Sequence, residues 1–82
     1  MSIEKIIFIM RYDYGFVFRV NFGLTKTTIS LNICKAIGNH KEKVIYFMNT
    51  LYNNSFTGEY NKEEEETVFT SEDSLIVIRI SQ

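Results

Sequence analysis

Two side chains near the middle of the sequence have the types that nucleophilic catalysis uses. Cys34 and His40 lie six residues apart, and they would form a nucleophile and base if both pointed into one pocket. The ordinary alternative for Cys34 is a small, buried apolar side chain at the end of a strand. One histidine and one cysteine cannot complete a structural zinc site without carboxylate ligands, so we expect no metal and no cofactor.

His40 also suggests a binding site of its own, because the sequence around it predicts the start of a helix. The first turn of a helix presents unpaired backbone N–H groups and the positive end of the helix dipole, which together suit a phosphate. Lys35, Lys41 and Lys43 add positive charge nearby. The alternative is that these are solvated surface residues, which are common around helix starts.

Acidic side chains gather in the last third of the chain. Residues 59–73 hold seven of them against the single Lys62. Neighbouring carboxylates repel one another and cannot all be paired locally, so we expect them on the surface. The acidic residues of this segment are Glu59, Glu63, Glu64, Glu65, Glu66, Glu72 and Asp73.

An acidic surface of this kind can occupy the place of nucleic-acid phosphates on a basic protein. Phe56, Tyr60 and Phe69 lie close by in the sequence and are predicted as aromatic anchors for such a contact. The alternative is a solvated loop that only keeps the chain soluble. We therefore take the acidic residues, with Tyr60 and Phe69, as the candidate partner-binding surface.

The chain contains no proline, so its four glycines are the main markers in the sequence of where one element ends and the next begins. Residues 3–12 are rich in β-branched and aromatic side chains, so they are predicted as a strand. Residues 16–22 are predicted as a second strand, because Phe16, Phe18, Val20 and Phe22 alternate with Val17, Arg19 and Asn21. A Gly-containing connection at 13–15 predicts an antiparallel hairpin between them. Residues 28–33 alternate again and predict a third strand.

The helix is predicted over about residues 40–53. Asn39 fits an N-cap with Glu42 as its capping-box partner, and the apolar stripe predicts one face packed on a sheet. The stripe consists of Val44, Phe47, Met48 and Leu51, with Ile45 and Tyr52 widening it.

The remainder of the chain is predicted to complete the sheet. Residues 55–66 suggest a polar loop of low order, with a short strand around Phe56 as an option. Residues 67–70 and 75–80 predict two strands joined by a turn at 71–74, with Ile76, Ile78 and Ile80 facing the core. The prediction is a single α+β domain over 1–82: one mainly antiparallel sheet in the order β-β-β-α-β-β with one helix packed across it.

Three segments resemble part of a known family. They are Ala36-Ile37-Gly38-Asn39-His40, the helix with Asn49-Thr50-Leu51, and the closing residues 75–82. Together they cover about half of the chain and resemble the viral ring nucleases, which are type III anti-CRISPR proteins. In that family a histidine after an Ile-Gly turn protonates the leaving oxygen while a ribose 2′-hydroxyl attacks a phosphate of a cyclic oligoadenylate. The resemblance implies His40 as the catalytic residue, although here Asn39 separates the glycine from the histidine.

A second resemblance is one of layout. Short acidic α+β chains with one helix and a Glu-rich loop are similar to phage inhibitors that block the DNA-binding groove of CRISPR nucleases. This resemblance implies a basic partner protein, such as a nucleic-acid-binding host defence effector.

The sequence therefore favours an anti-defence inhibitor that binds a partner through its acidic surface, and it favours a binding protein over an enzyme. Two alternatives stay open: a protein that binds or cleaves cyclic oligoadenylate with His40, and an immunity protein or antitoxin. A lone cysteine and the lack of a long apolar run predict a cytoplasmic protein, in the host cell if the source is viral, with no membrane partner. A homodimer is compatible with all of these.

Overall fold

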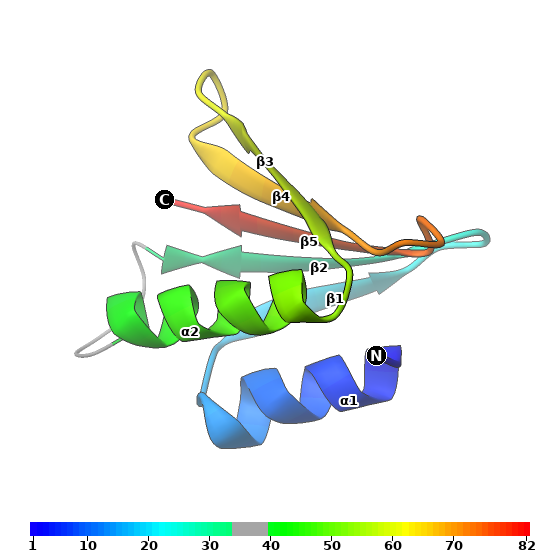
Figure 1. Cartoon of the computed structure of the whole chain (residues 1–82), viewed down its shortest axis with the longest axis horizontal. Coiled ribbons are helices and arrows are strands. Elements are labelled where there is room, and N and C mark those ends of the chain that lie inside the picture. The colour runs from blue at the N-terminus through cyan, green and yellow to red at the C-terminus, as the bar shows by residue number, and fades with distance from the viewer. Residues whose placement is uncertain (34–39) are drawn as a thin grey trace.

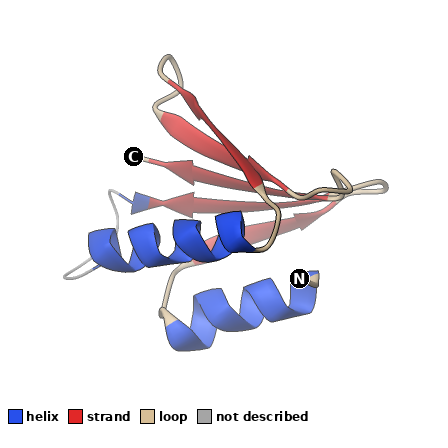
Figure 2. Ribbon diagram, viewed as in Figure 1, coloured by secondary structure: helices blue, strands red, loops and turns tan. Residues whose placement is uncertain are grey.

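The computed structural model describes residues 1–33 and 40–82, in which two helical segments pack on one face of a five-stranded sheet (Figures 1 and 2). The first segment is α1 (Ile3–Phe8), continued by a π-helical turn, η1 (Ile9–Asp13). The second is α2 (His40–Asn53). The α+β class is confirmed, with a second helical segment that the sequence did not predict.

The sheet consists of β1 (Phe18–Phe22), β2 (Thr27–Asn32), β3 (Thr57–Asn61), β4 (Glu66–Thr70) and β5 (Ile76–Ser81). Its spatial order is β1-β2-β5-β4-β3, so β1 and β3 are the two edges. The β2–β5 pair is parallel and the other three pairs are antiparallel. The sheet is therefore mixed, because the chain leaves β2 through α2 and returns beside it only after the β3–β4 hairpin.

The predicted strand at 3–12 and its hairpin at 13–15 are wrong, since this segment forms α1 and η1. The Ser2 hydroxyl caps the helix by accepting a hydrogen bond from the Lys5 N–H at 3.2 Å. Ile6 and Met10, one helical turn apart, are both fully buried. Gly15 takes a φ of +68° after the helix and turns the chain toward β1, a backbone conformation that glycine adopts without a Cβ clash.

The predicted helix at 40–53 and the buried stripe of Val44, Phe47, Met48 and Leu51 are confirmed. The predicted widening of the stripe by Ile45 and Tyr52 is wrong, because these side chains are 59% and 53% exposed. Val44, Phe47 and Leu51 are buried, and Met48 packs against them. The rings of Tyr14 and Phe16 contact Phe47 edge-on at 5.8 Å each. Aromatic packing between the connection to β1 and the middle of α2 therefore joins the two helical segments to one core. The predicted cap at Asn39 lies outside the described residues.

One apolar cluster fills the space between helices and sheet. It takes one set of alternating side chains from each inner strand, as expected for a sheet that is covered on one face. From β2, β4 and β5 these are Ile29, Leu31, Phe69, Ile78 and Ile80. No described element covers the opposite face, and no described helix is long and apolar enough to cross a membrane.

Candidate functional site

The four consecutive glutamates at 63–66, the acidic run, lie at the tip of the β3–β4 hairpin, which projects past the helices (Figure 1). The low-order loop predicted for residues 55–66 is wrong here, because Thr57–Asn61 pair with Glu66–Thr70 along their full length. Residues 62–65 form the turn between the two strands. Glu63, Glu64 and Glu65 are exposed in this turn, which we call the acidic tip.

Two sets of hydrogen bonds hold the acidic tip. The side-chain oxygen of Asn61 accepts from the backbone N–H groups of Glu63 and Glu64 at 3.0 and 3.1 Å. An asparagine that accepts from N–H groups two and three residues ahead builds a turn by itself. At the other end of the turn, the Glu65 carbonyl accepts from the Gln82 N–H at 3.1 Å. The backbone that carries the three carboxylates is thus fixed from both sides.

Glu66 belongs to a different environment, although it continues the run in sequence. It starts β4 on the open face of the sheet, and its carboxylate accepts a hydrogen bond from Arg79 of β5 at 2.5 Å. The side chain of Glu66 is 15% exposed and that of Arg79 is 48% exposed. Glu66 therefore stabilises the β4–β5 pair, and within the described part of the chain no ion pair engages Glu63, Glu64 or Glu65.

The two aromatic residues predicted as contacts of this surface lie in different environments. Tyr60 of β3 is 57% exposed, whereas Phe69 of β4 is 0% exposed. The Phe69 ring packs in the core and meets Tyr52 of α2 edge-on at 5.1 Å. The prediction of Phe69 as a contact residue is wrong, because Phe69 pairs with Ile78 on the helix-covered face. Phe56 is buried as well.

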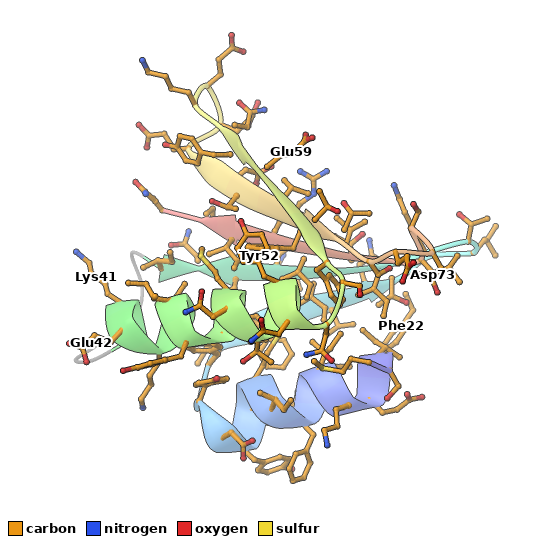
Figure 3. The ribbon with its side chains drawn as sticks, viewed as in Figure 1. Phe22, Lys41, Glu42, Tyr52, Glu59 and Asp73 are labelled. Atoms are coloured by element: carbon orange, nitrogen blue, oxygen red, sulfur yellow. The ribbon has the colours of Figure 1, made fainter. Side chains whose placement is uncertain are left out.

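Glu72 and Asp73 lie far from the acidic tip. They are in the turn between β4 and β5, at the opposite end of the strands, where Figure 3 shows Asp73. Glu59 projects from the middle of β3 on the open face, and it shares a shallow hollow of about 420 Å³ with Glu72. Of the seven predicted acidic residues, only Glu63, Glu64 and Glu65 share the acidic tip. Glu59 and Glu66 lie on the open face, and Glu72 and Asp73 lie in the turn at the other end of the strands.

Asp73 has a structural role that explains its position. Its carboxylate accepts hydrogen bonds from the Ser71 hydroxyl at 2.7 Å and from the Leu75 N–H at 3.0 Å. Because both bonds favour the ionised form, and the Ser71 bond contributes most, they lower the pKa of Asp73 below its ordinary value of 3.8. Asp73 shapes the turn and has one oxygen already occupied.

His40 begins α2, and its side chain lies outside the described residues, as does Cys34. The ring-nuclease interpretation of His40 therefore stays a prediction. Among the side chains that the structure describes, no group of three or more histidine, cysteine, aspartate or glutamate residues is arranged to hold a metal ion.

The residues that sequence reasoning missed are those that set the acidic tip in place. Asn61 immediately precedes the tip, and an asparagine at the start of a polar segment is a known turn signal. Arg79 lies between Ile78 and Ile80 in the last predicted strand, so the alternation indicates only that its side chain points away from the core. Its partner could not be identified from the sequence, because the β4–β5 register brings Glu66 and Arg79 together.

Comparison with known proteins gives no relative for this chain. No protein-family model matches the sequence. No curated protein and no solved structure is significantly similar to it.

Proposed function

We propose that this protein is a binding protein whose acidic tip docks on a basic surface of a partner protein that binds nucleic acid. The observation that carries the proposal is the fixed turn that presents Glu63, Glu64 and Glu65 together, with no cation paired to them in the described chain. An inhibitor of the anti-defence kind, acting in the cytoplasm of a host cell, would work in this way.

The ordered backbone of the turn favours a role in binding over a role in solubility alone. A loop that only keeps a chain soluble needs charge but no defined backbone. Here Asn61 and Gln82 hold the backbone of the turn, so little backbone entropy is lost when the turn meets a partner. Carboxylates carried close together on an ordered turn can match Lys and Arg side chains that otherwise bind phosphates.

The hairpin also offers contacts besides charge. Tyr60 lies one residue before Asn61 and is largely exposed, and Tyr is a frequent anchor at protein interfaces. Glu59 and Tyr60 are neighbours in β3, so they project from opposite faces of the hairpin. A groove that receives the tip would meet carboxylates at its floor, Tyr60 on one wall and Glu59 on the other.

Binding of this kind would inhibit by occupancy. Nucleic acid and the acidic tip compete for the same basic residues, and opposite charge speeds the encounter of the protein with its partner. Lys62, which is exposed in the same turn, reduces the net charge of the tip. The three glutamates remain in excess.

Displacement from DNA tests the proposal. Proteins of a bacterial lysate are bound to DNA-cellulose and eluted with the protein at fixed salt, and the eluate is analysed by quantitative mass spectrometry. We expect release of a specific basic protein by the wild type and much less release by a Glu63→Gln, Glu64→Gln, Glu65→Gln variant.

The matched control replaces three exposed acidic residues elsewhere, with Glu4→Gln, Asp13→Asn and Glu42→Gln, which changes the net charge equally. This control should release the same protein as the wild type. No release by the wild type, or equal release by the tip variant, would contradict the proposal.

A further inference from the structure

The strand β1 has an unused hydrogen-bonding edge. Among the strands that the structure describes, it pairs with β2 alone and lies at one edge of the sheet. The turn after it is closed by a bond from the Gly23 N–H to the Lys26 carbonyl at 2.9 Å. Hydrogen-bonded and non-hydrogen-bonded residue pairs alternate in an antiparallel ladder. Because Gly23 is bonded to Lys26, the backbone N–H and C=O groups of Asn21 and Arg19 also point toward β2. The N–H and C=O groups of Phe18, Val20 and Phe22 then point away from the sheet.

A second bond confirms this alternation. Thr27 is opposite Phe22 in the ladder, and its N–H donates to the Leu75 carbonyl at 2.8 Å, on the side away from β1. The pair Phe22–Thr27 is therefore non-bonded, as the alternation requires. The outer edge of β1 presents backbone groups at alternate residues from Phe18 to Phe22.

The side chains of β1 do little to block this edge. The helix-side residues Phe18, Val20 and Phe22 are all apolar, and Phe22 is 69% exposed. Val17 and Leu24, at the two ends of the strand, are also exposed large apolar residues. Natural edge strands are usually protected by proline, bulges or inward-pointing charges. The only charged residue of β1 itself is Arg19, on the open face. The Arg11 guanidinium of η1 lies over the Phe18 ring at 5.4 Å, and in the described part of the chain it leaves Val20 and Phe22 without a neighbouring charge of this kind.

The sequence of β1 is nearly symmetric about Val20, reading Phe-Arg-Val-Asn-Phe. We propose that β1 pairs antiparallel with β1 of a second copy of this chain about a twofold axis through Val20. Val20 then faces Val20 of the second copy, and Phe18 faces its Phe22. These are the three residues whose backbone groups point outward, so this register satisfies all of them at once.

The same register also fits the charges on the open face. Arg19 of each copy lies opposite Asn21 of the other, so the arginines do not oppose each other directly. On the helix side, the exposed ring of Phe22 gains a cross-strand aromatic partner. The dimer has one continuous ten-stranded sheet, twice the five strands of the chain, with β3 at both outer edges.

The position of Asn21 allows a test that uses two opposite changes at one exposed site. Asn21→Glu places a carboxylate opposite Arg19 twice in the dimer, whereas Asn21→Arg places like charges there twice. Cross-strand charge pairs of this kind should change the dimer dissociation constant by about 2- to 30-fold, tighter for Asn21→Glu and weaker for Asn21→Arg. Sedimentation equilibrium over a range of concentrations measures it.

Two further measurements keep the result interpretable. Asn53→Glu and Asn53→Arg make the same charge changes at an exposed residue near the end of α2 and should leave the dimer unchanged. Val20→Pro removes an outward N–H that β2 does not use. It should give a monomer that keeps its secondary structure by circular dichroism.

The proposal is overturned if the wild type is monomeric at every concentration up to about 1 mM. It is also overturned if a dimer forms whose dissociation constant is the same in both Asn21 variants, because a different surface then joins the copies.

Discussion

The two edges of the sheet differ in what they offer to another molecule. The β1 edge has apolar residues on the helix side and a single arginine on the other, and its sequence is nearly symmetric about Val20. The β3 edge has Gly58 and Glu59 at its centre and continues into the acidic tip. Two β3 strands brought together would bring carboxylates together, so this edge disfavours self-association and favours a basic partner.

The difference shows how one small sheet can separate two kinds of association. The inner strands β2, β5 and β4 supply the core, whereas the edges need only half of their backbone groups for folding. If β1 joins two copies, the two acidic tips lie at the outer edges of the dimer and are free to bind.

The largest effect should come from the aromatic residues of the hairpin. Phe69→Ala removes a fully buried ring and should lower the free energy of unfolding by about 3–5 kcal/mol. Tyr60→Ala, on the adjacent strand, should change it by less than about 0.5 kcal/mol, because most of its ring is already in water. Urea denaturation of both variants measures the difference. Equal losses would mean that the separation of Tyr60 and Phe69 is wrong.

Gly58 should also be needed for packing at the β3 edge. A Cβ added there would lie 2.7 Å from the Phe69 ring and 2.7 Å from the Tyr52 hydroxyl oxygen. Tyr52 lies near the C-terminal end of α2, beside β3 (Figure 3), and its hydroxyl group can move away from an added methyl group. The Phe69 ring has no such freedom. Gly58→Ala should therefore cost about 1–3 kcal/mol.

Two variants sharpen the Gly58 result when melting temperatures are compared. Glu59→Ala changes the neighbouring residue on the open face and should be within about 0.5 kcal/mol of the wild type. Adding Tyr52→Phe to Gly58→Ala removes one of the two close contacts and should restore part of the loss. A wild-type melting temperature for Gly58→Ala alone would contradict the packing described here.

The helix α2 could be predicted from the sequence, whereas the helical segment at residues 3–13 could not, and the difference has a physical cause. The α2 stripe is long and regular, so its bounds and its buried face were predictable. In residues 3–12 the β-branched isoleucines suggested a strand, but Ser2 caps a helix there and Ile6 and Met10 form its buried stripe. Intrinsic β preference is weak beside the burial of one helical face.

The hairpin shows the same limit for the candidate site. Val68 and Phe69 are adjacent apolar residues in a strand, so the sequence does not determine which one faces inward. The register with β5 decides it, because Phe69 pairs with Ile78 and Val68 with Arg79. Exposure of the acidic run was predictable from charge repulsion for Glu63 to Glu65. The pairing of Glu66 with Arg79 depends on strands that meet only in the folded chain.

The smallest stability effect should be at Asp73, at the far end of the sheet from the acidic tip. Its pKa is lowered in the folded protein, so its ionised form stabilises the fold above its ordinary pKa, and this stabilisation disappears as pH falls through the lowered value. Asp73→Asn should therefore lower the melting temperature near neutral pH, and the difference from the wild type should shrink below about pH 3.8. A difference that is constant with pH would contradict the assigned role.

The most direct test of the proposed function is the association rate of the protein with the basic protein that it displaces from DNA. Stopped-flow fluorescence at low and at moderate salt compares three proteins: the wild type, the variant with Glu63, Glu64 and Glu65 replaced by Gln, and the control with Glu4, Asp13 and Glu42 replaced by the corresponding amides. Charges that steer an encounter act on the on-rate and on its salt dependence. The tip variant should associate more slowly at low salt and depend less on salt, while the control keeps the wild-type rates. Equal rates for all three proteins at both salt levels would contradict binding through the acidic tip.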